Sequence, residues 1–308
     1  MKKVFIDGSA GTTGLRIYER LSARDDVEIL TRSDEKRKDP SARKEMLFKA
    51  DIAFLCLPDD AAREAVALAE GSDVVIIDAS TAHRTLPDWA YGFPELSKAH
   101  EEKILSSKRI AVPGCHASGF IALVYPLIEA GILPKASLLS CHSITGYSGG
   151  GKKMIGDYEN EDRSALLSAP RQYGLTQQHK HLKEMKGITG IENPPCFSPI
   201  VSDFYSGMTV TVPLFRSQIK GSLDEIKEVY KAKYNSELVS YTESADESGF
   251  ISGAALSGKD SMKITVAGNE ERILLIACYD NLGKGASGAA IECMNMVLGA
   301  DKTKGLVL

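Results

Sequence analysis

The sequence predicts an α/β protein in which a doubly wound parallel-sheet domain is followed by an α+β domain. The length of 308 residues suggests two domains, at roughly 150 residues per domain. Before Cys115, short apolar runs alternate with helical patterns, which is typical of a parallel sheet with right-handed crossovers. After Cys115 the pattern becomes richer in strands, and this change favours a second domain of a different kind.

In the first domain, apolar runs predict buried strands, and the patterns between them predict helices. The strands are expected at 3–7, 28–30, 52–57 and 74–78, and the helices at 14–23 and 61–70. The second of these helices is rich in alanine, and Asp59 and Asp60 stand where side chains cap a helix. Because ligands of such sheets bind at the carboxyl ends of the strands, we expect the site at that edge.

In the second domain, helical segments alternate with β-branched strands. Helices are expected at 120–130 and 222–234, and strands at 137–143, 208–212, 262–266 and 272–279. Gly268 and Asn269 form the expected turn between the last two strands. A final apolar helix at 286–298 is expected to return to the first domain. The predicted limits are therefore 1–114 with 283–308 for the first domain and 115–282 for the second.

Composition excludes several classes of protein. The net charge of -4 and the pI of about 5.9 argue against nucleic-acid binding by overall positive charge. No apolar run approaches the ~18 residues of a membrane span, and Asp7 interrupts the apolar start, so we expect neither a membrane segment nor a signal peptide. Six cysteines without a CxxC pair favour a cytoplasmic protein with reduced thiols and no metal.

A glycine-rich loop follows the first strand and precedes the first helix. Gly8 allows a tight turn, Gly11 lets the backbone approach a pyrophosphate, and Gly14 lets the helix pack on the strand. Thr12 and Thr13 add hydroxyl donors to the free N–H groups of the helix N-terminus. The pattern predicts a Rossmann-type dinucleotide site, and the alternative is a glycine-rich turn that binds no ligand.

The end of the second strand indicates which nicotinamide cofactor binds. In NAD-binding proteins, an acidic side chain at this position binds the adenosine ribose. In this sequence, Arg32 and Ser33 follow the strand instead. An arginine and a hydroxyl suit a 2′-phosphate, so NADP is favoured over NAD. The alternative is a solvated loop, because charged residues follow at once in 34–36.

Cys115 is the candidate nucleophile. It follows Pro113 and Gly114 at the end of a strand and begins a helix, where the helix dipole and backbone N–H groups stabilise a thiolate. The same N–H groups can serve as an oxyanion hole. The alternative is a small buried cysteine, which is how we interpret Cys56, Cys278 and Cys293, and we expect Cys141 and Cys196 to have structural roles.

Two histidines provide the candidate acid/base. His179 and His181 lie in a lysine-rich segment, and a cysteine nucleophile that forms a tetrahedral oxyanion needs such a group. If the segment is fully helical, residues two apart point to different faces, so the two histidines would not share one role. A surface histidine pair is the alternative, and zinc binding by the pair lacks a third ligand.

Together these features resemble the phosphorylating semialdehyde dehydrogenases over essentially the full chain. The family often has Tyr-Pro-Thr after its catalytic cysteine, and here the sequence has His116, Ala117 and Ser118 instead. The motifs that carry the resemblance are 6–8 with 11–15, 56–61, 78–84, 87–92, 113–115, 146–152, 179–181 and 280–288.

The resemblance assigns roles to residues of both domains. It implies Cys115 as the nucleophile and His179 as the acid/base. It further implies that the second domain is a substrate and dimerisation domain and that the protein is a homo-oligomer, a dimer or a tetramer. The residues implied on the substrate side are Arg84, Tyr173 and His181, and those implied as cofactor contacts are Ser80, Ser148, Gly149 and Asn281.

The short subtype of the family gives the expected reaction. NADPH would reduce the acyl phosphate N-acetyl-L-glutamyl 5-phosphate to the 5-semialdehyde through a thioester on Cys115, a step of arginine biosynthesis. One alternative is another acyl-phosphate reductase, such as aspartate-semialdehyde dehydrogenase, with a shorter substrate. A second alternative is a regulator that binds NADP without catalysis.

Overall fold

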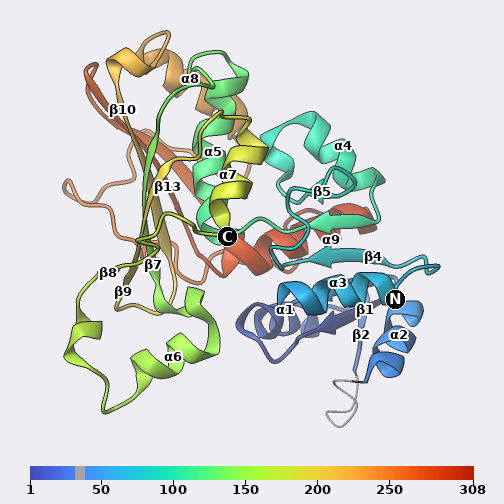
Figure 1. Ribbon diagram of the computed structural model, residues 1–308. Helices are drawn as coiled ribbons and strands as arrows, with labels where there is room; N and C mark the ends of the chain where they lie inside the picture. The colour runs from blue at the N-terminus through green and yellow to red at the C-terminus, as the bar shows by residue number, and fades with distance from the viewer. Residues whose placement is uncertain (32–38) are drawn as a thin grey trace. The chain divides into compact units, whose positions relative to one another are not determined.

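The computed structural model describes residues 1–31 and 39–308, and Figure 1 shows its course. The chain divides into two compact units. The first unit comprises Met1–Pro113 and Ala286–Leu306, and the second comprises Gly114–Gly285 and Val307–Leu308. From the sequence, the first domain was predicted to end at residue 114 and to resume at residue 283. The predicted fold class, a parallel-sheet α/β domain joined to a domain of another kind, is confirmed.

The first unit contains a six-stranded sheet in the order β2-β1-β3-β4-β6-β5, and all of its strand pairs are parallel. The chain turns to one side of β1 for β2 and to the other side for β3, so the strand order switches between β1 and β3. The strands are β1 (Lys2–Asp7), β2 (Val27–Leu30), β3 (Ile52–Leu55), β4 (Val75–Asp78), β5 (Ala90–Tyr91) and β6 (Arg109–Ala111).

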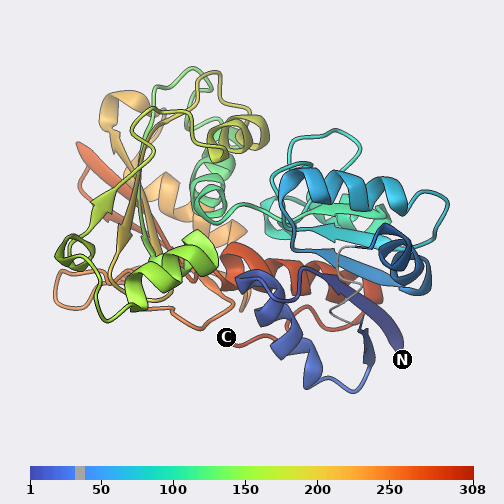
Figure 2. The same ribbon diagram turned by 60° about the horizontal axis from the view of Figure 1, so that its bottom comes forward.

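Helices cover both faces of this sheet. Ile17 and Leu21 of α1 pack in one apolar cluster with residues of α9, whereas Leu47 of α2 and Ala62 of α3 belong to the cluster on the other face. Figure 2 shows α9 in red on one side of the strands and α3 in blue on the other. Since both faces are buried, all four residues of β3 are apolar and buried. The helices are α1 (Thr12–Ser22), α2 (Pro40–Lys49), α3 (Asp59–Leu68), α4 (Lys98–Ser106) and α9 (Gly288–Leu298).

The second unit contains a seven-stranded sheet in the order β11-β12-β13-β10-β7-β9-β8. Pairs β7–β9 and β11–β12 are parallel and the other four are antiparallel. The turn predicted at Gly268 and Asn269 joins β12 to β13. The strands are β7 (Ser140–Gly146), β8 (Arg171–Gln172), β9 (Cys196–Ser202), β10 (Met208–Phe215), β11 (Val239–Tyr241), β12 (Met262–Gly268) and β13 (Arg272–Tyr279).

Helix α5 is the central helix of the second unit. It packs against β10, β13, α7 and α8 and is buried at most positions, which explains its nearly continuous apolar sequence. Tyr230 of α8 and Tyr234, the residue that follows α8, donate their hydroxyl protons to the Leu123 and Ala122 carbonyl oxygens of α5. The helices are α5 (Cys115–Glu129), α6 (Gly151–Glu159), α7 (His181–Thr189) and α8 (Leu223–Lys233).

Two local predictions were wrong. Asp59 does not cap α3: the N-cap is Pro58, and the Asp59 carboxylate accepts hydrogen bonds from the Thr81 amide and hydroxyl groups, which hold the next loop. The strand predicted at 137–143 begins instead at Ser140 and continues to Gly146, where the glycine cluster starts. No helix in the described ranges is both long and apolar enough to span a membrane.

Candidate active site

The glycine loop of the first unit has the geometry that its glycines predict. Gly8 has a φ of +91°, and a Cβ built on it would lie 2.2 Å from the Cys56 carbonyl oxygen. A Cβ on Gly14 would lie 2.4 Å from the Gly8 carbonyl oxygen, which shows how closely α1 approaches the end of β1. Both positions therefore exclude any larger residue without a backbone shift.

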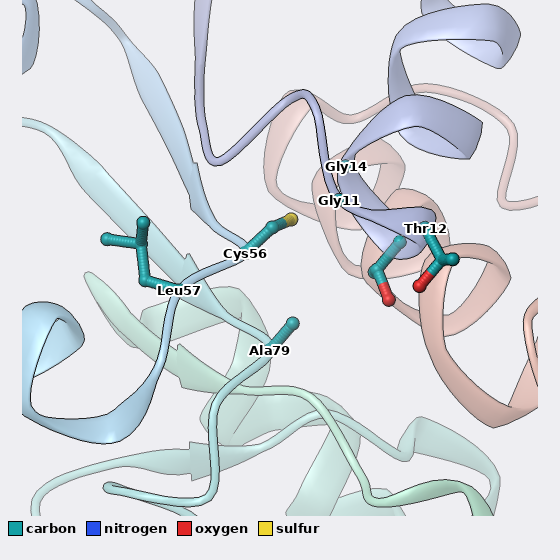
Figure 3. A pocket seen from close by; sticks show the side chains of 7 residues that line it. Gly11, Thr12, Gly14, Cys56, Leu57 and Ala79 are labelled. Atoms are coloured by element: carbon teal, nitrogen blue, oxygen red, sulfur yellow. The ribbon is translucent and has the colours of Figure 1, made fainter. Parts of the chain in front are cut away.

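A cleft of about 190 Å³ lies beside this loop, at the carboxyl ends of the strands. Figure 3 shows α1 facing the residues that follow β3 and β4. The N-cap of α1, Gly11, provides no side-chain cap, so the first N–H groups of the helix can bind a ligand. A cleft of this size at the switch between β1 and β3 suits the pyrophosphate of a dinucleotide. The lining residues are Gly11, Thr12, Thr13, Gly14, Cys56, Leu57 and Ala79.

Replacing Gly14 by alanine is expected to destabilise the first unit and to weaken nucleotide binding. The added methyl group must displace the Gly8 backbone, and overpacking of this kind costs about 1–3 kcal/mol. Calorimetry should show a lower melting temperature, and a fluorescence titration should show a raised Kd for NADPH. Gly156→Ala in α6 is the matched control, because a Cβ there meets nothing within 4 Å. Equal stability of the two variants would contradict the close approach.

Arg84 and Ser80 lie in a buried polar cluster of the first unit. Arg84 donates from Nε to the Val112 carbonyl oxygen (2.8 Å) and from Nη2 to the Ala79 carbonyl oxygen (2.9 Å). Ser80 donates from its amide and hydroxyl groups to the buried Asp78 carboxylate. The arginine therefore fastens the loop after β4 to the segment after β6. A substrate role for Arg84 and a cofactor role for Ser80 stay predictions.

The second unit begins at the candidate nucleophile. Cys115 is the first residue of α5 and is partly exposed. The Gly114 amide before it donates to a carboxylate oxygen of the buried Glu184 (2.7 Å). The Tyr279 hydroxyl donates to the Cys115 carbonyl oxygen (2.5 Å) and accepts from the Gly119 amide (3.0 Å). Helix α7 and strand β13 thus hold the backbone on both sides of the thiol.

Five aromatic side chains, those of His116, Tyr173, His179, His181 and Phe197, gather beside the start of α5. The ring of His116 lies 5.8 Å from that of His179 and 5.6 Å from that of His181, between centroids. The ring of Tyr173 lies 6.1 Å from that of His116 and 5.9 Å from that of His179. The segment is not fully helical, because α7 starts at His181. Both predicted histidines consequently reach one cluster, with rings 4.8 Å apart.

Burial controls the charge of this cluster. Burial, followed by the neighbouring Lys180, lowers the pKa of His179 below its ordinary value of 6.5. Burial also lowers the pKa of His116, to about 3, with a smaller effect of His179. The pKa of Tyr173 is raised above its ordinary value of 10.0 by burial and then by the Cys115 thiolate. The side chains of His116, Tyr173 and His179 are therefore mainly neutral at pH 7.

Three predicted cofactor residues meet in the second unit. Asn281 donates from its side-chain amide to the Ser148 hydroxyl (3.0 Å) and accepts from the Gly207 amide (2.9 Å). A Cβ on Gly149 would lie 3.5 Å from the Asn281 side-chain nitrogen. The structure brings these residues together, and their contact with a cofactor stays a prediction. The predicted Arg32 and Ser33 lie outside the described residues.

Sequence reasoning missed the residues that support the thiol and the histidines. Glu184 is a buried acid one turn after His181 on α7, and an acid on an apolar helix face was the available signal. His116 was seen only as a departure from the usual residue after the nucleophile. Tyr279 and Ser143 gave no signal, because their contacts with α5 come from strands distant in sequence.

Comparison with known families defines the class of protein. Residues 3–104 match the NAD binding domain of semialdehyde dehydrogenases, and residues 115–281 match the semialdehyde dehydrogenase dimerisation domain. The chain therefore belongs to the semialdehyde dehydrogenase family, which confirms the resemblance noted in the sequence.

The names of curated relatives are more specific than the name of the family. An N-acetyl-gamma-glutamyl-phosphate reductase of Brucella ovis is 46% identical and covers 96% of this chain and 99% of its own. N-acetyl-gamma-glutamyl-phosphate reductase 2 of a Nostoc species is 44% identical and covers 99% of both chains.

Solved structures show the same fold at low sequence identity. Aspartate semialdehyde dehydrogenase II from Vibrio cholerae, complexed with ASA, has a TM-score of 0.72 at 16% identity and covers 97% of this chain and 98% of its own. Aspartate semialdehyde dehydrogenase from Francisella tularensis has a TM-score of 0.73 at 14% identity and covers 97% of this chain and 100% of its own.

Proposed function

We propose that the protein reduces N-acetyl-L-glutamyl 5-phosphate to N-acetyl-L-glutamate 5-semialdehyde with NADPH, in arginine biosynthesis. The observation that carries the proposal is the placement of Cys115 at the start of α5, beside a cluster that contains His179 and Tyr173. The relatives at 44–46% identity, which cover nearly the whole chain, supply the substrate.

Cys115 is the covalent catalyst in this proposal. Its thiolate attacks the carbonyl carbon of the acyl phosphate, the carbon–sulfur bond forms, and the bond to phosphate breaks. The positive end of the α5 dipole and the first N–H groups of α5 favour both the thiolate and the oxyanion of the tetrahedral intermediate. After reduction, the thiohemiacetal releases the aldehyde and returns the thiolate.

His179 moves the proton that this sequence of steps requires. The thiohemiacetal oxygen gains a proton when the thioester is reduced, and the reverse reaction removes the same proton. His179 Nδ1 accepts from the His181 amide (3.3 Å), and within the described residues Nε2 forms no hydrogen bond. A nitrogen without a protein partner can serve the substrate oxygen.

The glycine loop would hold the dinucleotide, and the nicotinamide when bound supplies the hydride. The uncapped N-terminus of α1 and the glycines that permit close approach fit its pyrophosphate. The match to an NAD binding domain supports a nicotinamide cofactor, and the preference for NADP rests on Arg32 and Ser33.

Arg32→Ala is expected to raise the KM for NADPH by about 10- to 100-fold and to change the KM for NADH little. The arginine would form a charge-assisted hydrogen bond with the 2′-phosphate, worth about 1.5–3 kcal/mol, and NADH lacks that phosphate. Steady-state kinetics with both cofactors measure the effect. Lys49→Ala is the control, because it removes an exposed charge of the same unit. Arg24→Ala is unsuitable, because Arg24 forms an ion pair with Asp26. Equal effects on both cofactors would exclude a 2′-phosphate contact.

The reaction itself is tested in the direction of semialdehyde oxidation. Purified protein is mixed with phosphate, NADP and one of several semialdehydes, and NADPH formation is followed at 340 nm. The highest kcat/KM is expected for N-acetyl-glutamate 5-semialdehyde. A preference for aspartate semialdehyde would assign the protein to another acyl-phosphate reductase, and NADP binding without turnover of any aldehyde would favour a regulator.

We further propose that the protein is a cytoplasmic homo-oligomer, either a dimer or a tetramer. The second unit matches a dimerisation domain, and none of the six cysteines forms a disulfide. Light scattering coupled to gel filtration gives the number of chains, and a single mass of 33.3 kDa would contradict the proposal.

A further inference from the structure

His116 is buried where its two ring nitrogens each meet one hydroxyl group. Nδ1 lies 2.6 Å from the Ser143 hydroxyl oxygen on β7, and Nε2 lies 2.7 Å from the Tyr173 hydroxyl oxygen. The residue follows Cys115 directly, and its ring contacts those of His179 and His181. The directions of these two hydrogen bonds follow from the partners that each hydroxyl has.

Ser143 determines the direction of the first hydrogen bond. Its side chain is fully buried, and among the described residues its hydroxyl has one hydrogen-bond partner, His116 Nδ1. A buried hydroxyl that accepted from Nδ1 would leave its own proton without an acceptor, which is costly. Ser143 therefore donates, and Nδ1 carries no proton.

The charge state of His116 determines the direction of the second bond. The ring is buried, and the rings in contact with it, those of Tyr173, His179, His181 and Phe197, supply no negative charge near pH 7. The imidazole is consequently neutral and holds one proton. Because Nδ1 accepts from Ser143, that proton lies on Nε2, and His116 donates to the Tyr173 hydroxyl oxygen.

The remaining proton of the chain belongs to Tyr173. Its hydroxyl oxygen accepts from His116, and within the described part of the chain it has no other hydrogen-bond partner. The phenol keeps its own proton, which points away from His116 and is available to a ligand. Cys115 is close enough to Tyr173 for its thiolate to act on the phenol electrostatically.

We propose that His116 is a positioning residue that holds the Tyr173 hydroxyl as a hydrogen-bond donor toward the substrate. In the relay, Ser143 donates to His116, His116 donates to Tyr173, and Tyr173 donates to an oxygen of the acyl phosphate or of its oxyanion. This inference rests on the proposed function for its ligand, whereas the relay itself rests on the hydrogen bonds of the second unit.

The tautomer of His116 gives a test that is independent of activity. Protein labelled with ¹⁵N-histidine is examined by long-range ¹H–¹⁵N correlation spectra, and His116→Gln identifies the signals of this ring. We expect a protonated Nε2 and an unprotonated Nδ1, unchanged between about pH 5 and 8. A protonated Nδ1, or a titration within this range, would overturn the relay.

A double-mutant cycle tests whether His116 acts through Tyr173. Tyr173→Phe should lower kcat/KM for semialdehyde oxidation about 100-fold, the effect of losing one oxyanion donor. Ser143→Ala, which frees the tautomer, should lower it about 10-fold alone and less than about 2-fold when added to Tyr173→Phe. His116→Leu should behave in the same way. Ser140→Ala, on the same strand and without a side-chain hydrogen bond in the described residues, is the control and should change nothing.

Independent effects in this cycle would contradict the positioning role, because the losses would then multiply to about 1000-fold. If Ser143→Ala lowered only the thermal stability and kept wild-type kinetics at low temperature, the positioning role would also be overturned. If the wild-type protein turned over no semialdehyde, the proposed function would fail, whereas the nitrogen shifts would still decide the relay.

Discussion

Replacing Cys115 by serine is expected to abolish nearly all turnover, while the affinity for NADP stays within about 2-fold of the wild-type value. Serine is a far weaker nucleophile at neutral pH, and loss of the nucleophile in a covalent enzyme can cost about a million-fold in kcat. The glycine loop belongs to the other unit and is unaltered by the change. Stopped-flow kinetics and a fluorescence titration measure the two quantities.

Cys196 supplies the matched control for this experiment. It is exposed on β9, so Cys196→Ser should keep wild-type turnover. Mass spectrometry of protein mixed with acyl phosphate should show an acyl adduct on the wild type and on Cys196→Ser, and none on Cys115→Ser. An adduct that persists in Cys115→Ser, or turnover above a few per cent, would show that the nucleophile lies elsewhere.

His179→Asn is expected to lower turnover by about 10²–10⁴-fold in both directions, because one group gives and removes the same proton. Thiolate formation should suffer less, since the start of α5 already supports the thiolate. Iodoacetamide should therefore alkylate Cys115 at a near-normal rate in this variant. If alkylation slowed in step with turnover, His179 would chiefly activate the thiol.

The pH dependence adds a second measurement of the same residue. Burial lowers the pKa of His179, so its basic form predominates above that value. Semialdehyde oxidation needs this base and should fall as the pH decreases through the lowered pKa, below 6.5. Reduction needs the acid and should fall as the pH rises above it. His179→Asn should lose both dependences. If His181→Asn lost both pH dependences and His179→Asn kept them, the acid/base would be His181.

The sequence predicted the parts of the fold that have strong local signals. Apolar runs located β1 to β4 of the first unit within one to two residues, whereas the short strands β5 and β6 were not among the strands whose ranges were predicted. The glycine spacing located the loop that lines the cleft. Helix α2 was missed because its apolar residues follow no clear helical stripe. Helix α6 was missed because it starts within the glycine cluster of 149–151.

The candidate site was predicted where chemistry is visible in residue types and was missed where it depends on tertiary contacts. Cys115 and His179 could be chosen from a thiol at a helix start and a histidine downstream. The bend before α7, which lets His179 and His181 face one cluster, is a property of the folded chain. The hydrogen bond from Tyr279 to the Cys115 carbonyl oxygen links positions 164 residues apart, which no local pattern reveals.

The Tyr279 hydroxyl on β13 donates to the Cys115 carbonyl oxygen and accepts from the Gly119 amide, so it supports the first turn of α5. A Cβ on Gly119 would come within 2.7 Å of that hydroxyl, so the glycine and the phenol occupy complementary space. A larger residue at position 119 is therefore expected only where residue 279 has also changed. A mutant library that varies residue 119 alone should yield almost no active members. In a library that also varies residues 210 and 279, active members with a larger residue at position 119 should have exchanged Tyr279 and Val210 as well.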